Sequence, residues 1–188
     1  MRALTEIILH ATATRPDWRD GQSTAAKVAE VRRWHVEDRG WRDVGYHYLI
    51  DRDGTLAPGR PLEQTGAHVI GRNTGTVGIA LFGGHGSSAR DLFDDHFTAD
   101  QDRAVRKLIA SLSSRFPSIR KVSGHNEYAA KACPGFKVPE FMSAHAEASA
   151  TPATSSGAQV DPVEVARWRI AAIRDAAQSA LDELPDPV

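Results

Sequence analysis

The chain has 188 residues, and 41% of them are hydrophobic, which is enough for one ordinary globular domain with an appendage. Its 23 Lys and Arg residues nearly balance its 24 Asp and Glu residues, so no overall field argues for a nucleic acid as partner. The single cysteine, Cys133, excludes an internal disulfide framework and fits a reducing compartment. No stretch approaches the length of a membrane span, so we expect no membrane insertion.

Residues 4–14 predict the first strand, because they are rich in β-branched residues and precede a polar, proline-containing loop. His10 lies where this strand meets the loop. The apolar run at the amino terminus is short, so we interpret it as a strand and expect no signal peptide. Ser23 or Thr24 then caps a predicted helix that ends near Arg39.

Residues 44–50 and 55–57 predict a hairpin around the Asp53-Gly54 pair. A glycine after an aspartate supplies the positive φ that a tight hairpin turn requires. Successive side chains of a strand point to opposite faces, so Tyr46 and His47 are expected in different surroundings. One of them can face a cleft while the other packs.

Residues 62–73 predict an irregular loop that carries His68 and Asn73, and loops on a rigid sheet are where binding residues concentrate. A left-handed turn conformation is an equally good interpretation of Asn73. Residues 76–82 are the most apolar strand and are expected at the centre of the sheet. Residues 83–97 predict a solvated excursion, and its two histidines favour surface positions over a second metal site.

The remaining elements are a helix over residues 98–115 with Thr98 as its cap, a short strand over residues 119–122 and a helix over residues 138–148. Helices that alternate with strands, together with one hairpin, imply a mixed sheet with helices on its faces. We therefore predict an α/β fold, a single domain whose central mixed β-sheet is flanked by helices.

The stretch VSGHNEYAAKACPGF, residues 122–136, places His125, Lys131 and Cys133 within one short run. Imidazole nitrogens and thiolates are good zinc ligands, and a catalytic zinc needs three protein ligands with a fourth position open for water. His10 is the best candidate for the third ligand, because a side chain that leaves a rigid strand at its tip is well held for a metal. The spacing alone leaves open a buried cysteine and a packed or solvated histidine.

Four separated blocks carry a resemblance, namely EIILHATAT, GWRDVGYHYLIDRDGTLAPGR, TGAHVIGRNTGTVGIALFGG and GHNEYAAKACPGF. In this order they resemble the zinc-dependent N-acetylmuramoyl-L-alanine amidases of the type 2 family, which includes phage endolysins and peptidoglycan-recognition proteins. The resemblance runs from about residue 4 to residue 136 and leaves residues 137–188 unexplained.

The resemblance implies roles for individual residues. It implies one Zn²⁺ per chain, bound by His10, His125 and Cys133. It places the catalytic Tyr46 at the border of the zinc site. It also implies a substrate groove for peptidoglycan or muropeptides, to which we assign His47, His68 and Asn73.

The reaction that the resemblance implies is hydrolysis of the amide between the lactyl group of N-acetylmuramic acid and L-alanine. Two imidazoles and one thiolate leave the zinc site with a net positive charge, which acidifies water and polarises the amide carbonyl. Lys131, two residues before a ligand, is expected to stabilise the oxyanion that forms. Tyr46 is expected to donate a hydrogen bond to the same oxygen, or to position the water and relay its proton. For Lys131 the usual alternative is a solvated surface lysine, against which the KACP spacing argues.

A phage or prophage endolysin released through a holin pore is the first expectation for the biological role, because we find no signal sequence and no wall-binding module of recognisable size. Such a protein stays in the host cytoplasm until another protein gives it access to the cell wall. The alternatives are a cytosolic muropeptide-recycling amidase, whose third ligand is usually aspartate, and a recognition protein that binds peptidoglycan without cleaving it. Recognition proteins typically lack the cysteine, so Cys133 favours an enzyme.

Residues 1–148 are the predicted catalytic domain, and the small, polar residues of 149–160 predict a flexible linker. Residues 161–188 predict a C-terminal helix with a narrow apolar seam. Three arginines against six acidic residues give this segment a net charge of −3, which argues against a membrane-disrupting helix. We expect it to dock on its own domain or to pair chains weakly, and to be dispensable for amide hydrolysis.

Overall fold

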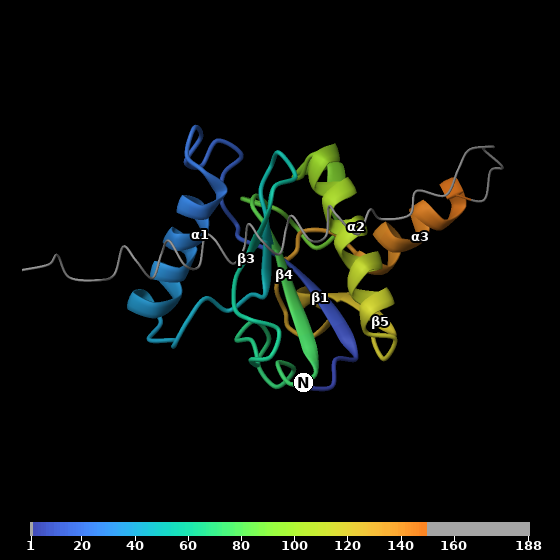
Figure 1. Cartoon of the computed structure of the whole chain (residues 1–188). Coiled ribbons are helices and arrows are strands. Elements are labelled where there is room, and N and C mark those ends of the chain that lie inside the picture. Colours follow the sequence, from blue (N-terminus) through green and yellow to red (C-terminus); the bar gives the residue numbers. More distant parts are fainter. Residues whose placement is uncertain (1, 150–188) are drawn as a thin grey trace, which may run out of the picture. The chain divides into compact units, whose positions relative to one another are not determined.

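The computed structural model describes residues 2–149 and contains one mixed sheet of five strands (Figure 1): β1 (Glu6–Ala11), β2 (Tyr48–Ile50), β3 (Leu56–Pro58), β4 (Thr76–Leu81) and β5 (Lys121–Gly124). The strand order is β3-β2-β4-β1-β5. Strand β4 pairs in parallel with β1 and β2, β1 pairs in parallel with β5, and β2 and β3 form an antiparallel hairpin. The apolar strand expected at the centre of the sheet is therefore the central one. The predicted helix over residues 161–188 and the predicted linker, apart from Ser149, lie outside the described residues.

Helix α1 (Thr24–Arg33) begins after Ser23, whose side chain accepts a hydrogen bond from the N–H of Ala26 at 3.2 Å. A π-helical turn, η1 (Trp34–Asp38), continues α1 to the position at which the sequence predicts its end. The hairpin forms around the predicted turn, but its first strand begins at Tyr48 rather than at residue 44.

Helix α2 (Ala99–Arg115) begins with reciprocal hydrogen bonds in which Thr98 Oγ1 accepts from the N–H of Gln101 and Gln101 Oε1 accepts from the N–H of Thr98, both at 3.1 Å. It ends before Phe116, whose ψ of 82° is not helical, because Pro117 disfavours a helical conformation at the residue before it. Helix α3 (Val138–Ser149) is the last described element.

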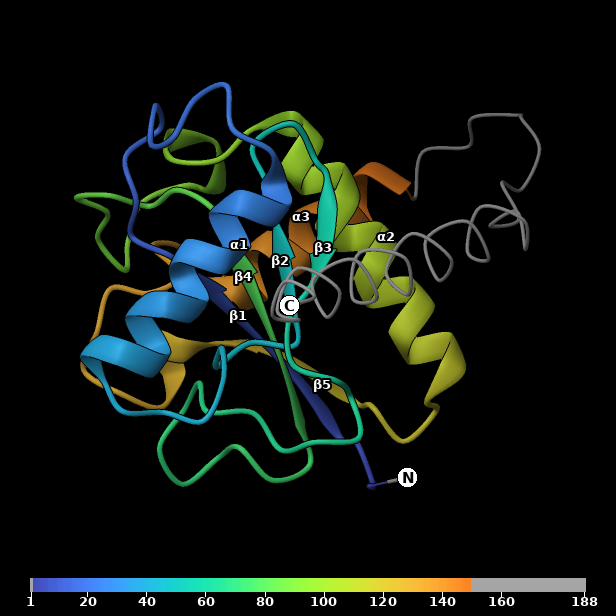
Figure 2. The same ribbon diagram turned by 60° about the vertical axis from the view of Figure 1, so that its left-hand side comes forward.

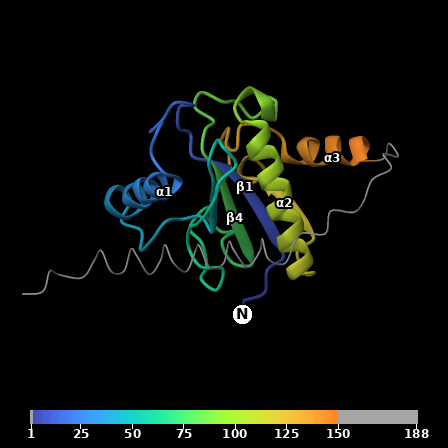
Figure 3. The same ribbon diagram turned by 45° about the horizontal axis from the view of Figure 1, so that its top comes forward.

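Helix α1 covers one face of the sheet, and α2 and α3 cover the other (Figures 1 and 3). Every residue of β1 and β4 is buried, as expected for parallel strands with helices on both faces. Alternate β1 side chains, Ile7 and Leu9 among them, enter the apolar cluster formed with α2 and α3. Figure 2 shows α1 on the opposite face, where Ala80 and Phe82 pack with its buried valines. The predicted α/β fold is confirmed.

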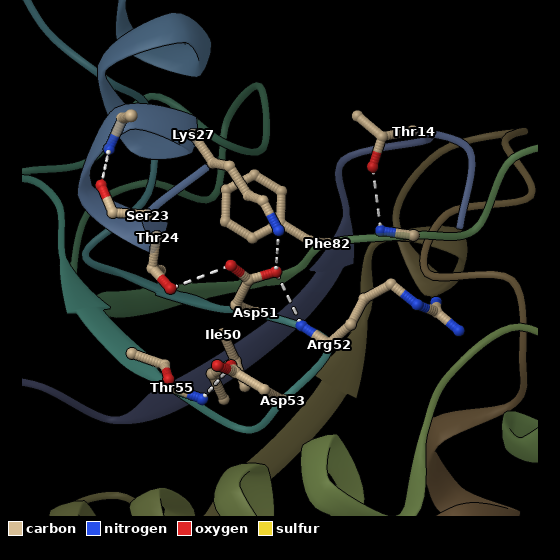
Figure 4. Close-up of polar contacts among 12 residues, drawn as sticks. Thr14, Ser23, Thr24, Lys27, Ile50, Asp51, Arg52, Asp53, Thr55 and Phe82 are labelled. Carbon is tan, nitrogen blue, oxygen red and sulfur yellow. Dashed lines mark hydrogen bonds and ion pairs between the residues drawn. The ribbon is translucent and has the colours of Figure 1, made fainter. Parts of the chain in front are cut away.

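A buried ion pair joins α1 to the hairpin (Figure 4). Lys27 Nζ lies 2.9 Å from Asp51 Oδ1, and the two residues are 8% and 3% exposed. Asp51 also accepts hydrogen bonds from Thr24 Oγ1 at 2.9 Å and from the N–H of Arg52 at 2.8 Å. Because a buried charge must be paired and hydrogen-bonded, these contacts fix the position of α1 over the strands.

The described residues form no helix with both the length and the apolar character that a membrane crossing requires.

Candidate metal centre

Three side chains converge at one end of the sheet. His10 lies on β1, His125 follows β5 directly, and Cys133 lies in the loop after β5. Strands β1 and β5 are parallel neighbours, so side chains at their carboxyl ends meet at the same edge. The possible ligand atoms of the three residues all lie within 4.8 Å of one another, and Cys133 Sγ is 3.8 Å from His10 Nδ1. The structure therefore brings the three predicted ligands together.

The electrostatics of this cluster keep its imidazoles neutral. Burial lowers the pKa of His10 well below its ordinary value, and the charges of His68, His125 and Lys131 lower it further. Burial and then Lys131 also lower the pKa of His125. Burial raises the pKa of the Cys133 thiol to about 11. Neutral imidazoles offer lone pairs, and a bound cation is what would deprotonate a thiol in this setting.

The residues present fit a zinc ion. Two imidazoles and one thiolate are a ligand set that zinc prefers, with ligand atoms about 2.0 and 2.3 Å from the metal. Two such atoms on one tetrahedral zinc lie roughly 3.3–3.6 Å apart, so side chains whose ligand atoms lie within 4.8 Å of one another would move together by roughly 1 Å at most to bind it. His10 is held by the sheet and is 1% exposed, while His125 and Cys133 are partly buried; His125 begins a 3-10 turn, η3 (His125–Glu127), and Cys133 lies in the loop that follows.

Tyr46 and Lys131 lie beside this cluster. The rings of Tyr46 and His10 are 5.1 Å apart between centroids. Burial, and then the neighbouring Cys133, raise the pKa of Tyr46 above its ordinary value, so its hydroxyl stays protonated and able to donate. Lys131 is exposed, and it is close enough for its positive charge to lower the pKa values of both His10 and His125. Both predicted catalytic residues therefore lie where they can act on groups near the ligands.

The three residues assigned to the substrate groove lie in different surroundings from those expected. His47 is 1% exposed and His68 is 6% exposed, so neither presents an open surface. His47 Nδ1 accepts a hydrogen bond from the N–H of Gly78 at 3.0 Å, and His68 Nδ1 lies 3.1 Å from His10 Nε2. Asn73 Oδ1 accepts hydrogen bonds from the N–H groups of His68 and Val69, at 2.8 and 2.9 Å. The positive φ considered for Asn73 is found instead at Gly71 and Gly75.

The described residues also form an open groove of about 670 Å³ beyond the carboxyl end of β1. It begins at Thr12, two residues after His10. Its lining includes two tryptophans, two arginines and one acidic residue, namely Trp18, Trp34, Arg15, Arg39 and Asp38. Sequence reasoning missed this groove, although ligands of α/β proteins commonly bind outside the carboxyl ends of parallel strands.

The histidines of the excursion are separate from the metal cluster. His85 is exposed and lines the groove. His96 Nε2 lies 2.7 Å from Asp91 Oδ2. Hydrogen bonds from Ser88, and then the contact with His96, lower the pKa of Asp91 to about 2.

The sequence model of the family described as N-acetylmuramoyl-L-alanine amidase matches residues 1–136. The chain belongs to this family. The amidase is 39% identical over 141 residues to the endolysin of Enterobacteria phage T3, which covers 74% of this chain and 87% of the relative. It is 38% identical over 135 residues to the endolysin of Escherichia phage T7, which covers 72% and 83%. It also resembles the solved structure of peptidoglycan recognition protein-LE in complex with tracheal cytotoxin, with a TM-score of 0.57 and 25% identity over 72% of this chain and 76% of that one.

The resemblance seen in the four sequence blocks is thus confirmed. Hydrolysis of the amide that joins N-acetylmuramic acid to L-alanine is the activity of this amidase. The matched residues 1–136 contain all the candidate site residues, from His10 to Cys133.

Proposed function

We propose that this amidase depends on one Zn²⁺ held by His10, His125 and Cys133. The proposal rests above all on the convergence of two imidazoles and one thiol, with ligand atoms within 4.8 Å of one another. A zinc ion in such a site supplies a Lewis acid that polarises a carbonyl group and lowers the pKa of water. The protein's part is to hold these ligands in place beside a groove open to solvent.

Tyr46 and Lys131 act on the reacting amide. The protonated hydroxyl of Tyr46 donates a hydrogen bond to the carbonyl oxygen as negative charge develops on it, or orients the attacking water and relays its proton. Lys131 brings a fixed positive charge toward the same oxygen, and a preorganised donor at such a position lowers the barrier by a few kcal/mol, roughly 3. The departing amino group of L-alanine receives the proton that the water loses.

The substrate is peptidoglycan or a muropeptide derived from it, and the role is that of a phage endolysin. The endolysin names of the two phage relatives and the tracheal cytotoxin bound to peptidoglycan recognition protein-LE support this assignment. The groove beside β1 offers aromatic faces for sugar or alkyl groups and guanidinium groups for carboxylates. We further infer that the protein acts after release from the host cytoplasm, and that hydrolysis does not need residues 161–188.

Purified sacculi test this function. In zymography, the full chain is expected to clear sacculi, and a chelator is expected to prevent this clearing. Labelling of newly exposed amino groups should find L-alanine at the new termini. Binding to sacculi without release of L-alanine termini would instead identify a non-catalytic recognition protein, and clearing that a chelator leaves unchanged would contradict the zinc dependence.

A further inference from the structure

His68 contacts His10 of the proposed metal centre, and Thr76 contacts His68 in turn. His68 Nδ1 lies 3.1 Å from His10 Nε2, and Thr76 Oγ1 lies 3.3 Å from His68 Nε2. Both side chains are buried, with 6% exposure for His68 and 3% for Thr76. We infer that His68 and Thr76 are positioning residues, which orient the His10 ring and select the tautomer that turns Nδ1 toward the metal. This inference rests on the proposed zinc site.

The donor and acceptor of each hydrogen bond between His10, His68 and Thr76 follow from the bond that Thr76 makes with Arg72. Thr76 Oγ1 has one hydrogen and donates it to the carbonyl oxygen of Arg72 at 2.7 Å. Toward His68 it therefore accepts, so Nε2 carries the ring hydrogen of neutral His68. His68 Nδ1 is then an acceptor and receives the Nε2–H of His10. His10 Nδ1 is left with its lone pair, on the side where Cys133 Sγ lies at 3.8 Å.

The His68 ring is itself held in a slot made by glycines. A Cβ at Gly78 would lie 2.6 Å from His68 Cδ2, and a Cβ at Gly66 would lie 2.6 Å from the same atom. These separations are shorter than any contact a side chain tolerates, so the ring packs directly on backbone. Asn73 Oδ1 fixes the chain at this point, because it accepts from the N–H groups of His68 and Val69.

This arrangement has a direct consequence for metal binding. His10 is 1% exposed, so removing the acceptor at residue 68 leaves its Nε2–H buried without a partner. The His10 ring then also loses the hydrogen bond that fixes its orientation. Groups that hold a metal-ligating histidine by its other ring nitrogen typically change metal affinity by about 10- to 100-fold when they are lost.

Two matched pairs of variants in the full chain test the inference. His68→Leu removes the acceptor, whereas His68→Asn keeps an oxygen near the position of Nδ1. Thr76→Val removes the hydroxyl, whereas Thr76→Ser keeps it. Ser118→Ala is the control, because it removes the hydroxyl of an exposed serine that donates to the carbonyl oxygen of Leu4 at 2.6 Å, away from the site.

Zn²⁺ affinity is measured by competition with a chromophoric chelator, and the absorption spectrum of the Co²⁺-substituted protein reports the thiolate–metal bond and the ligand geometry. We expect His68→Leu to bind Zn²⁺ at least about tenfold more weakly than the wild type, and His68→Asn to recover most of that loss. Thr76→Val should bind more weakly than Thr76→Ser, and its Co²⁺ spectrum should be altered. Ser118→Ala should match the wild type in both measurements.

Equal Zn²⁺ affinities and identical Co²⁺ spectra within both matched pairs would overturn the inference while leaving the zinc site intact. A wild-type protein that binds neither Zn²⁺ nor Co²⁺ would refute the zinc site itself, and the positioning roles with it. Melting temperatures of the metal-free variants separate weakened metal binding from loss of fold. If His68→Leu does not fold, the Thr76→Val and Thr76→Ser pair decides the result.

Discussion

Replacing Lys27 with methionine measures how much the buried ion pair between α1 and the hairpin contributes to stability. Methionine keeps the apolar stem but removes the ammonium, which lies 2.9 Å from Asp51 Oδ1. At that separation and an effective dielectric constant of about 20, the attraction is roughly 6 kcal/mol, much of which offsets the desolvation of two charges. The carboxylate of Asp51, at 3% exposure, would then be buried without a counter-charge. We expect the free energy of unfolding to fall by about 3–5 kcal/mol.

Urea-induced unfolding of the full chain, followed by tryptophan fluorescence, measures this loss. The double variant Lys27→Met/Asp51→Asn should regain most of the lost stability, because the remaining amide oxygen still accepts hydrogen bonds and no unpaired charge is buried. Lys137→Met is the matched control: Lys137 Nζ lies 2.8 Å from Glu140 Oε1, but these side chains are 55% and 68% exposed. We expect the control to lose at most about 1 kcal/mol. A Lys27→Met variant that loses no more than Lys137→Met would refute the reasoning from burial.

Three further predictions concern catalysis, pH and the C-terminal segment. Lys131→Ala and Tyr46→Phe should each lower kcat on a soluble muropeptide by about 100- to 1,000-fold with full zinc content. A pure rise in KM would place both residues in substrate binding instead. Burial lowers the pKa of His35 to about 4 in the folded protein. Between about pH 4 and 6.5 the unfolded chain therefore binds more protons at this residue than the folded chain does, so the free energy of unfolding should fall as the pH drops through that window. His35→Asn should remove up to about 3 kcal/mol of this pH dependence in urea titrations, and an unchanged pH profile would contradict it. Deletion of residues 151–188 should leave muropeptide turnover within about tenfold of the wild type, or 1.4 kcal/mol of barrier, and a larger drop would give the segment a part in hydrolysis.

Local sequence signals predicted most of the fold. Thr98 is the predicted cap of α2, and its side chain does accept a hydrogen bond from the N–H of Gln101 at the start of that helix. The apolar residues of β4 predicted its central place in the sheet. The predicted ligands also meet, because His10 and His125 leave adjacent parallel strands at the same end and Cys133 follows within a short loop.

Other features depend on tertiary contacts that no local pattern encodes. The loop that carries His68 folds back over β4, and its ring is buried only because Gly66 and Gly78 leave space on facing segments. The family resemblance and the position on a loop instead assign this histidine to a substrate groove. The π-helical turn η1 could likewise not be predicted from the sequence, because no particular residue type distinguishes the hydrogen-bonding register of a π-helix from that of an α-helix. Thr76 begins a buried strand, and its role emerges only from its position beside His68.

Titration of zinc into metal-free protein tests the central claim most directly. Turnover is followed as release of L-alanine amino termini from sacculi, with bound metal counted in the same samples. The zinc site predicts no turnover without metal, full turnover at one Zn²⁺ per wild-type chain, and neither tight zinc binding nor turnover in a folded Cys133→Ala variant. Full turnover by the metal-free wild type, or near-normal turnover with stoichiometric zinc in Cys133→Ala, would contradict it.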